Sequence, residues 1–556
     1  MIQATSHPGN RHRRQPPHPK GRQVDDAALE EVRGLLGAGE RRRDLLIEYL
    51  HQIQDRFGHI QARHLAALAA DLRLAQAEVY EVATFYAHFD VVKEGEQAPA
   101  PLTVRVCGGI ACELAGGGDL HDSLADALDG NARIVRAPCL GACHQAPVAV
   151  VGRRRIVGAD NGKVKAAMAA ADNEPEIPAY KNFDAYRADG GYDILAACQQ
   201  GERSREAIID AVEASGLRGL GGGGFPVARK WRFLLDAPKP RLLVVNADEG
   251  EPGTFKDRHC LGTDPHRILE GALIAAWAVE AEEVYIYLRD EYPEIREILV
   301  KEIAKAETAA VTDGARIHLR RGAGAYICGE ETALLESLEG KRGLPRNRPP
   351  YPAQMGLFAR PTLIHNVETL YWLREILERG GDWYTQAGRP RFYSVSGRVK
   401  EPGVKLAPAG VTAGQLIEDH CGGMADGHRF KAYLPGGASG GILPASEADL
   451  PLDFGTLDEH GCFVGSAAVV VLSDQDDIRA VVRNLLRFFA EESCGQCTPC
   501  RVGCEKMLGL VGPPAWNPAL MTELSELMRD ASICGLGQAA PNPVLCALKF
   551  FPGEVD

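Results

Sequence analysis

The chain has 556 residues, of which 45% are hydrophobic and 25% charged, and its net charge is −13. This length exceeds what one hydrophobic core supports and predicts several domains. The acidic balance argues against nucleic-acid binding, which needs a basic face. The most apolar candidate for a membrane helix, around residues 273–279, is interrupted by Glu270 and Glu280, so we expect a soluble, cytoplasmic protein that is not inserted in a membrane.

The N-terminal part is expected to hold a tail and a helical bundle. Residues 1–24 contain no Asp or Glu and several Arg and Pro, which predicts a disordered basic tail over 1–28. A transit peptide is the alternative, but it is disfavoured by the prolines and the lack of apolar periodicity. Helical spacing of apolar residues over 44–57, with Gly58 as a stop, and again around 65–72 and 79–86 predicts a helical bundle over 29–98.

The rest of the chain predicts four further domains. Alternation over Leu102–Cys107, a helix near 120–128 and strands near Ile134 and over Val148–Val151 indicate a small α/β domain over 99–178. Short buried strands at Leu242–Val245 and Val284–Leu288 indicate a larger α/β domain over 179–390. A Gly- and Pro-rich region with short β-type runs covers 391–474, and a helical region covers 475–556.

Fifteen cysteines, an odd number, fit poorly with a disulfide framework and suggest metal sites in a reducing compartment. The first cluster pairs Cys107 with Cys112 and Cys139 with Cys143, two loops that can supply the four thiolates of a 2Fe-2S cluster. Zinc is the alternative, since its ligands use similar spacings. A helix and a strand between the pairs favour iron–sulfur.

The second cluster is a C-x2-C-x2-C run at Cys494, Cys497 and Cys500, which can occupy three corners of a 4Fe-4S cubane. Cys534 is the expected fourth ligand, with Cys504 and Cys546 as competitors. Cys504 is expected in a helix that starts after Arg501 and points about a turn away.

Three loops of the larger α/β domain carry candidate binding residues. The glycine run 219–224, with Lys230 beyond it, can let backbone N–H groups approach a phosphate, although a flexible linker is the alternative. Residues 246–252 follow a strand and carry carboxylates where open α/β sheets bind ligands; a solvated acidic turn is the alternative. The third loop, 322–331, combines small residues, one Tyr and paired carboxylates.

These motifs carry a family resemblance. The chain resembles a fusion of the two NADH-oxidising subunits of respiratory complex I, in the form used by soluble NAD-dependent formate dehydrogenases. Residues up to about 178 resemble the small 2Fe-2S subunit, with its helical bundle and thioredoxin-like domain. The remainder resembles the flavoprotein subunit through the motifs GLGGGGFPVARKW, NADEGEPGTFKD, GAGAYICGEE and ESCGQCTPCR with SICGLGQ.

The resemblance implies a multidomain α/β fold in which a Rossmann-like domain binds FMN and NAD. The module over 391–474 is then ubiquitin-like, of the soluble-ligand-binding type, and the C-terminal helices hold the 4Fe-4S cluster. The implied metal ligands are Cys107, Cys112, Cys139, Cys143, Cys494, Cys497, Cys500 and Cys534.

The resemblance also implies residues for flavin and nucleotide. FMN would lie against Gly221, Gly222, Gly224, Lys230, Asn246, Asp248, Glu249, Tyr326, Gly329, Glu330 and Asn366. The adenine of NADH would stack among Phe225, Phe233 and Tyr351, and Glu251 and Glu331 would hold ribose and nicotinamide. Glu251, Glu331 and Tyr326 are the candidate catalytic residues.

The chain departs from the family pattern at several of these positions. The family often has Phe at Tyr351, Lys at Arg348 and Asn at His365, and the complex I motif usually has Arg at Leu220. Arg348 keeps the charge with a different shape. His365 puts that flavin contact in doubt.

The stretches 393–402 and 433–444 look most like the beta (diaphorase) subunit of molybdenum- or tungsten-dependent formate dehydrogenase. This implies a partner subunit that holds the metal and further iron–sulfur clusters, in a hetero-oligomer such as a dimer of heterodimers. The diaphorase subunit of an NAD-reducing hydrogenase, or a fusion of complex I NADH-binding subunits, is the alternative. A zinc-binding scaffold and a stand-alone NADH-dependent reductase are competing hypotheses from other classes.

Overall fold

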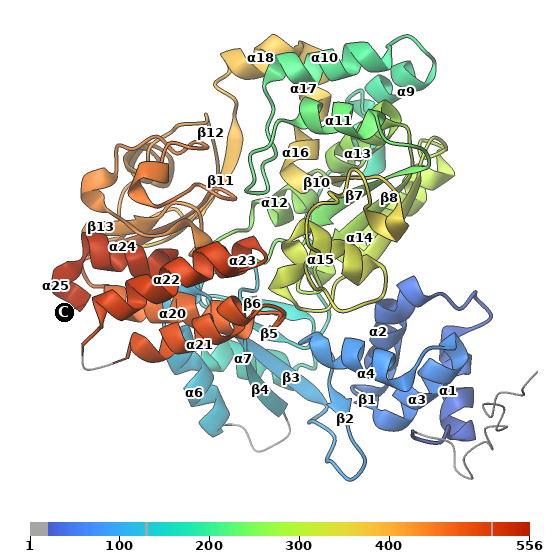
Figure 1. Cartoon of the computed structure of the whole chain (residues 1–556), viewed down its shortest axis with the longest axis horizontal. Helices are drawn as coiled ribbons and strands as arrows, with labels where there is room; N and C mark the ends of the chain where they lie inside the picture. Colours follow the sequence, from blue (N-terminus) through green and yellow to red (C-terminus); the bar gives the residue numbers. More distant parts are fainter. Residues whose placement is uncertain (1–20, 128–131, 513–514, 556) are drawn as a thin grey trace, which may run out of the picture. The chain divides into compact units, whose positions relative to one another are not determined.

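The computed structural model describes residues 21–127, 132–512 and 515–555, and the chain divides into two compact units, residues 1–98 and 99–556 (Figure 1). Most of the expected tail, residues 1–20, lies outside the described residues. Its expected end at residue 28 is wrong, because helix α1 begins at Asp26. The Asp25 side chain accepts hydrogen bonds from the backbone N–H groups of Ala27 and Ala28, which caps this helix.

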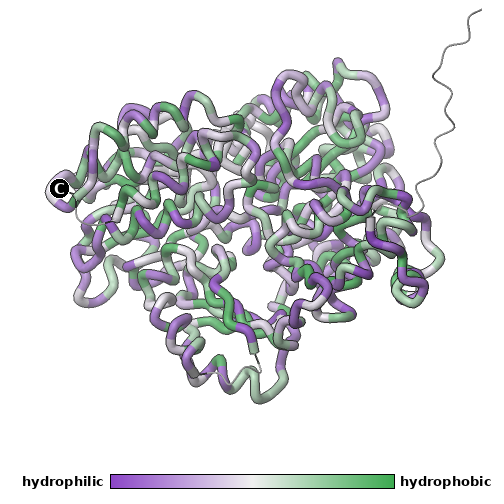
Figure 2. Tube along the Cα trace, turned by 60° about the horizontal axis from the view of Figure 1, so that its bottom comes forward, coloured by the Kyte–Doolittle hydropathy of each residue, from purple (hydrophilic) through white to green (hydrophobic). Residues whose placement is uncertain are grey.

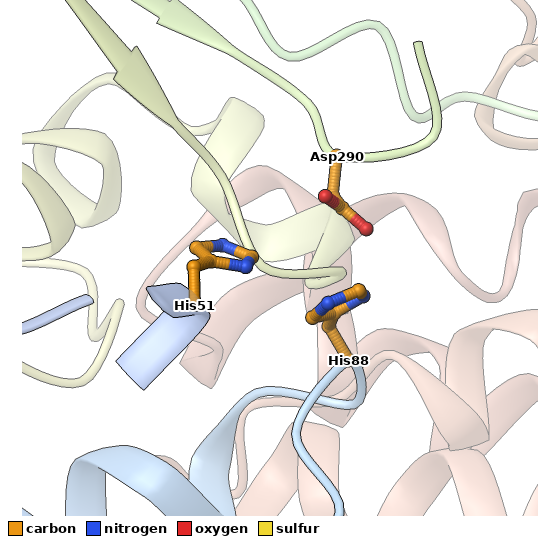
Figure 3. A group of neighbouring side chains, drawn as sticks. All are labelled: His51, His88 and Asp290. Atoms are coloured by element: carbon orange, nitrogen blue, oxygen red, sulfur yellow. The ribbon is translucent and has the colours of Figure 1, made fainter. Parts of the chain in front are cut away.

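The first unit is the expected helical bundle. Gly58 ends its second helix in a left-handed conformation, the backbone state that glycine adopts without strain. His51 and His88, drawn in Figure 3, lie with ring centroids 4.8 Å apart and pack against Phe89; Asp290, drawn with them, belongs to the second unit. The elements are α1 (Asp26–Leu36), η1 (Arg43–Leu45), α2 (Leu46–Phe57), β1 (Ile60–Gln61), α3 (Ala62–Leu72), α4 (Gln76–Phe85) and β2 (Val91–Val92).

The second unit begins with a four-stranded sheet in the order β4-β3-β5-β6. Strand β3 pairs parallel with β4 and antiparallel with β5, and their inward side chains Val104, Val106 and Val151 form a small core with Leu124. The strands predicted at Leu102–Cys107, near Ile134 and at Val148–Val151 are β3, β4 and β5, and the helix predicted near 120–128 is α6. Strand β6 and helix α7 were not predicted from the sequence. The elements are β3 (Leu102–Cys107), α5 (Ile110–Leu114), α6 (Gly117–Ala127), β4 (Ala132–Ala137), η2 (Cys143–Gln145), β5 (Val148–Val151), β6 (Arg154–Val157) and α7 (Asn161–Ala169).

A four-stranded parallel sheet forms the centre of the second unit, in the order β10-β7-β8-β9 (Figure 1). The chain lays down β7, β8 and β9 in one direction and then returns to place β10 on the other side of β7. The strand order therefore reverses between β7 and β10, the point at which open α/β sheets bind ligands. The strands are β7 (Arg241–Ala247), β8 (Ala281–Leu288), β9 (Arg316–Arg321) and β10 (Thr362–Asn366).

Helices cover this sheet, as parallel strands require, because crossover connections place helices on the faces. The most apolar of them, α13, lies almost wholly in the core, which explains the hydrophobic run that the sequence showed around residues 273–279. The helices are α8 (Phe183–Ala188), α9 (Asp193–Gln199), α10 (Arg205–Ser215), α11 (Val227–Leu235), α12 (Lys256–Thr263), α13 (Pro265–Val279), α14 (Pro293–Thr308), η3 (Tyr326–Gly329), α15 (Glu331–Leu338), η4 (Leu357–Ala359), α16 (Val367–Tyr371), α17 (Leu373–Arg379) and α18 (Gly381–Gln386).

A mixed five-stranded sheet follows, in the order β12-β11-β15-β13-β14, with β11 parallel to β15. In local numbering the order is second, first, fifth, third, fourth, as expected for a ubiquitin-like module. The elements are β11 (Arg391–Gly397), β12 (Gly403–Ala407), α19 (Ala413–Gln415), η5 (Leu416–His420), β13 (Phe430–Leu434), η6 (Ala438–Gly440), β14 (Leu443–Pro444), η7 (Ala445–Glu447), η8 (Asp458–His460) and β15 (Ala468–Ser473).

The C-terminal part is helical and confirms the fold class expected from the sequence. Its first helix, α20, places Val481, Leu485 and Phe489 on a buried face. The helices are α20 (Ile478–Glu491), α21 (Thr498–Leu510), α22 (Pro518–Ala531), α23 (Gly535–Ala539), α24 (Asn542–Phe550) and α25 (Pro552–Val555).

Hydrophobic residues are interspersed with hydrophilic ones along the chain (Figure 2). Among the residues described, none of the helices combines the length and the apolarity that a bilayer crossing demands.

Candidate functional site: a nucleotide edge beside two cysteine clusters

The first cysteine quartet lies at the end of β3 and β4, where the loops of the small sheet meet. Cys107, Cys112, Cys139 and Cys143 are all buried, at most 5% exposed, and the Sγ atoms of Cys139 and Cys143 lie 3.4 Å apart. The Cys107 thiol contacts those of Cys112 and Cys139, so the two loops supply one group of four thiols. A Cβ on Gly109 would lie 3.3 Å from the Cys139 Cβ, which shows how closely the loops approach. This donor set fits a 2Fe-2S cluster.

The second cluster surrounds a pocket at the start of α21. Cys494, Cys497, Cys500 and Cys534 all line this pocket. The other lining residues are Ile327, Pro345, Ser493, Gln496, Ile533 and Leu536. Four convergent thiols in a largely aliphatic pocket fit a 4Fe-4S cluster, whose reduction potential depends on its exposure to water.

The two competing cysteines take other places. Cys504 lies beside Cys500 on the same helix, and the Cys546 Sγ faces the Cys462 Sγ at 3.5 Å; neither is among the lining residues. The expected start of this helix after Arg501 is wrong. Helix α21 begins at Thr498, because proline is well suited to the first helical turn and Pro499 stands there.

The glycine loop runs between α10 and α11 and closes on itself through a hydrogen bond of 3.1 Å from the Gly224 N–H to the Gly219 carbonyl. Gly222 and Gly224 have φ of 120° and 59°, a region that favours glycine. A Cβ on Gly221 would lie 2.9 Å from the Cβ of Asn366, the last residue of β10. The loop is therefore a tight cradle at the carboxyl edge of the parallel sheet, which argues against a flexible linker.

Two asparagines mark the point where the strand order reverses. Asn246 of β7 and Asn366 of β10 are partners in the sheet register. The Asn246 side chain donates to the Gly329 carbonyl at 2.9 Å, and the Asn366 side chain donates to an Asp257 carboxylate oxygen at 2.6 Å. Both side chains are thus fixed at the edge where a ligand is expected.

The acidic loop contains three carboxylates with different roles. Glu249 is 6% exposed and caps α12: it accepts hydrogen bonds from the backbone N–H groups of Asp257 (2.8 Å) and Arg258 (3.0 Å) and from the Tyr292 hydroxyl (3.0 Å). Burial raises its pKa to about 7. These contacts account for its burial without a ligand, and its flavin contact stays a prediction.

Asp248 differs from its neighbour. Its Oδ2 atom is buried and has no hydrogen-bond partner among the described residues. A buried acceptor without a partner is costly, because it has lost its water. Burial also raises the pKa of this carboxyl well above its usual value. The free acceptor fits a ligand that carries hydroxyl groups, such as the ribityl chain of FMN.

Glu251 joins three segments. It accepts hydrogen bonds from the Ser439 backbone N–H (2.7 Å) and hydroxyl (2.6 Å), and from the Tyr326 hydroxyl. Burial raises the pKa of Glu251. The acidic loop, the turn η3 and the ubiquitin-like module therefore meet at one carboxylate.

The third loop lies between this edge and the 4Fe-4S pocket. The Tyr326 N–H donates to the Glu492 carboxylate at 2.8 Å, next to the cysteine run, and Ile327 lines the pocket. Glu330 caps α15 through the N–H groups of Thr332 and Ala333. The same short segment therefore contacts both candidate cofactor sites.

Three large aromatic side chains of this domain are exposed, and the ring centroids of Phe225 and Phe233 lie 6.4 Å apart. Phe225, Phe233 and Tyr351 are 44%, 49% and 54% exposed, which is unusual for large apolar side chains. Arg229 lies 5.8 and 5.4 Å from the two Phe ring centroids. Such rings suit stacking with a base.

Charged groups lie on the same edge. Glu331 pairs with Arg348 at 3.0 Å and with Lys230 at 3.5 Å, and Lys230 also donates to the Ile364 carbonyl at 2.9 Å. His365 is turned into the core, where its Nε2 accepts a hydrogen bond of 2.7 Å from the Trp231 indole N–H.

Several residues of the site were not identified from the sequence: Asp257, Tyr292, Ser439 and Glu492. Ser439 stands in the glycine-rich stretch 433–444, whose only signal is its resemblance to the formate dehydrogenase beta subunit. Glu492 stands two residues before Cys494. Neither signal told which distant carboxylate or amide each residue would meet.

Comparisons with known proteins agree with this arrangement. The family model of the Nuo51 FMN-binding domain matches residues 212–375, that of the thioredoxin-like [2Fe-2S] ferredoxin matches 33–172, and that of the NADH-ubiquinone oxidoreductase-F iron-sulfur binding region matches 480–556. Fold, donor sets and matched regions together define an oxidoreductase module that binds FMN, NAD, a 2Fe-2S cluster and a 4Fe-4S cluster.

Relatives place the chain more closely. A subunit of the NADH-quinone oxidoreductase of Rhizobium meliloti is 41% identical over 399 residues, 68% of this chain and 94% of the relative. The mitochondrial NADH dehydrogenase [ubiquinone] flavoprotein 1 of Dictyostelium discoideum is 39% identical, over 64% of this chain and 79% of the relative. The chain belongs to the family of these NADH-oxidising flavoprotein subunits of complex I.

A solved structure extends the similarity to the N-terminal region. A chain of an NAD+-reducing [NiFe]-hydrogenase in the H2-reduced state has a TM-score of 0.81 and 32% identity, and the match covers 93% of both chains. The similarity to this chain therefore spans both the region matched by the [2Fe-2S] ferredoxin model and the region matched by the FMN-binding model.

Proposed function

We propose that this chain is the FMN- and iron–sulfur-containing subunit of a soluble NAD-dependent formate dehydrogenase. Electrons taken from formate on a molybdenum- or tungsten-containing partner subunit reach this chain through iron–sulfur clusters and reduce NAD, so that formate and NAD give CO2 and NADH. The NADH-oxidising module is common to the family, whereas the formate-oxidising partner is specific to this proposal.

One observation carries the redox function: the segment from Tyr326 to Glu330 contacts both the nucleotide edge and the 4Fe-4S pocket. When bound, FMN exchanges hydride with nicotinamide and single electrons with iron–sulfur clusters. The chain's own residues provide the positions for that exchange. We propose that Gly221, Gly222 and Gly224 hold the phosphate and that the unpartnered Oδ2 of Asp248 accepts a hydrogen bond from a ribityl hydroxyl.

The nucleotide is proposed to lie outside the flavin, toward the exposed rings. Phe225, Phe233 and Tyr351 stack with the adenine, and Glu331, held by Arg348 and Lys230, accepts hydrogen bonds from ribose hydroxyls. Glu251 and Tyr326 bond to one another and orient the nicotinamide side of the site. The eight predicted cysteines hold the two clusters.

The choice of formate rests on the likeness of residues 393–402 and 433–444 to the formate dehydrogenase branch. The second of these stretches contains Ser439, which contacts Glu251 through its backbone and its hydroxyl. A diaphorase subunit of an NAD-reducing hydrogenase is the second candidate, favoured by the match over 93% of both chains.

Purification of the native complex separates the two candidates. The proposal expects a companion that contains molybdenum or tungsten, and reduction of NAD by formate. Nickel in the companion, with NAD reduction by hydrogen and none by formate, would overturn the formate assignment and favour the hydrogenase. A preparation that lacks both FMN and acid-labile sulfide would overturn the redox function itself.

A further inference from the structure

A second close pair of thiols lies outside both cluster sites. Cys462, in the loop after η8, and Cys546, in α24, are each 2% exposed, and their Sγ atoms are 3.5 Å apart. They are 84 residues apart in the sequence, on the ubiquitin-like module and on the C-terminal helices. Neither lines the 4Fe-4S pocket. The pair therefore joins two structural parts without belonging to a predicted cofactor site.

The surroundings of this pair are shaped to the two sulfurs. Gly441 packs against both: a Cβ there would lie 2.7 Å from the Cys462 Sγ and 2.9 Å from the Cys546 Sγ, and its φ is 84°. The backbone N–H of the next residue, Ile442, hydrogen-bonds to both sulfurs. A backbone N–H directed at sulfur stabilises a thiolate, because it offers a donor to the negative charge.

The two thiols are not equivalent. A hydrogen bond from the Cys462 thiol lowers the pKa of Cys546 and outweighs burial, which raises it; Ile442 and Lys549 lower it further. The same contact and burial both raise the pKa of Cys462. A thiolate is the form that reacts with oxidants, and a neighbouring thiol can then resolve the product. Cys546 is thus suited to react first and Cys462 to resolve.

We propose that Cys462 and Cys546 form a reversible disulfide when a peroxide reaches the protein. The Cys546 thiolate attacks one peroxide oxygen, the O–O bond breaks, and the departing hydroxide takes up a proton to leave as water, which gives a sulfenic acid. The Cys462 sulfur then attacks the Cys546 sulfur, the S–O bond breaks, and a second water leaves with the Cys462 proton. The two thiols together lose two electrons, which the peroxide accepts.

Geometry favours this step. A disulfide needs an S–S distance of about 2.05 Å, so the sulfurs must approach by about 1.5 Å, a change that rotation about the two Cα–Cβ bonds can supply. Oxidation would link the ubiquitin-like module to α24. The linked loop is adjacent to Ser439, whose carbonyl accepts a hydrogen bond of 2.9 Å from Asn542 of the same helix.

Peptide mapping of the full-length protein tests the proposal. The anaerobically purified protein is treated with a small excess of hydrogen peroxide, its free thiols are blocked with N-ethylmaleimide, and it is digested without reduction. We expect a linked peptide that contains Cys462 and Cys546 and that disappears on treatment with dithiothreitol. Recovery of both cysteines as blocked thiols after peroxide treatment would overturn the proposal.

Three variants sharpen the test. Cys462→Ser should lose the linked peptide and leave Cys546 as a sulfenic acid that dimedone labels, whereas Cys546→Ser should lose both the link and the label. Cys421→Ser removes another buried thiol of the same module and should retain the link. A link from Cys546 to a different cysteine in the wild-type protein, or dimedone labelling of Cys462 in Cys546→Ser without labelling of Cys546 in Cys462→Ser, would overturn the pairing or the order of steps.

Discussion

The guanidinium group of Arg289 donates a hydrogen bond of 2.8 Å to the backbone carbonyl of Cys139. Its other terminal nitrogen donates to the Glu249 carbonyl at 2.5 Å, and the side chain is buried. A buried cation therefore spans the first cysteine quartet and the acidic loop. The Tyr292 ring packs against Gly141 of the cysteine loop, where a Cβ would lie 2.2 Å from the Tyr292 hydroxyl oxygen.

A positive charge beside a cluster ligand favours the reduced, more negative cluster. We therefore expect Arg289→Gln to lower the midpoint potential of the 2Fe-2S cluster, on the order of 60 mV for each 1.4 kcal/mol of lost interaction with one electron. Redox titration followed by electron paramagnetic resonance measures the shift. Arg289→Lys keeps the charge and should shift less, and the 4Fe-4S signal of the same samples is the control. An unchanged 2Fe-2S potential in Arg289→Gln would contradict the expectation.

The fourth ligand of the second cluster can be tested by a matched pair of variants. Cys534→Ser should abolish or strongly alter the 4Fe-4S signal, because Cys534 lines the pocket with the three cysteines of the run. Cys504→Ser should retain the signal, since Cys504 lies beside Cys500 but not on the pocket wall. Iron content and low-temperature spectra measure both. The reverse pattern would show that Cys504 is the ligand.

Glu249→Gln should destabilise the protein. The carboxylate accepts three hydrogen bonds, and an amide nitrogen would face a donor that it cannot bond, which costs about 1–3 kcal/mol. Thermal unfolding should therefore occur at a lower temperature, and NADH oxidation should fall. Glu331→Gln, whose side chain is partly exposed, is the control for stability. A variant with unchanged unfolding but impaired NADH oxidation would instead support a direct contact of Glu249 with the cofactor.

Phe225→Ala and Tyr351→Ala should weaken NADH binding with little effect on stability, because both rings are largely exposed. Loss of one stacking partner costs about 1–3 kcal/mol, which corresponds to a KM for NADH raised roughly 5- to 150-fold. Steady-state kinetics with an artificial electron acceptor measures this KM. Leu527→Ala removes an equally exposed apolar side chain from α22 and should leave the KM unchanged. Equal KM values in all three variants would exclude Phe225 and Tyr351 from the NADH site.

Acid stability should depend on His365. Burial, with Lys230 nearby, lowers its pKa well below the usual value near 6.5. Below about pH 6.5 the histidine binds a proton in the unfolded chain but not in the folded chain. It therefore lowers the free energy of unfolding as the pH falls, by at most about 1.4 kcal/mol per pH unit. His365→Asn can still accept the Trp231 hydrogen bond and should lose less stability between pH 7 and about pH 5.5.

Urea unfolding at several pH values tests this expectation. The difference in unfolding free energy between His365→Asn and the wild type should move in favour of the variant as pH falls. A difference that stays constant over the range would show that His365 does not titrate differently in the two states.

The parts of the fold that the sequence predicted are those governed by local patterns. Alternation located β3, short apolar runs located β4 and β5, and Gly58 ends α2. The predicted cysteines lie in two groups of four. The contacts that build the site are of another kind. Glu251 meets Ser439 across 188 positions, and Tyr326 meets Glu492 across 166. No local periodicity encodes such pairings, because they depend on how the sheets and helices dock.

Helix capping explains why one predicted ligand residue, Glu249, already has hydrogen-bond partners in the protein. The sequence shows Glu249 as a carboxylate after a strand, a position suited to a ligand. In the structure the start of α12 follows within a few residues and uses that carboxylate as its cap. The same acidic motif thus contains an acceptor occupied by the protein, Glu249, and one left without a partner among the described residues, Asp248.

The turn η3 has a mechanical consequence. At the start of this four-residue turn the Tyr326 N–H donates a hydrogen bond to the Glu492 carboxylate. At its end the Gly329 carbonyl accepts a hydrogen bond from the Asn246 side chain. This one short turn therefore links the nucleotide edge to the pocket proposed for the 4Fe-4S cluster. We expect an insertion in this turn to increase the electron-transfer distance between the two proposed cofactor sites, whereas insertions in the surface loops of either neighbouring domain should leave that distance unchanged.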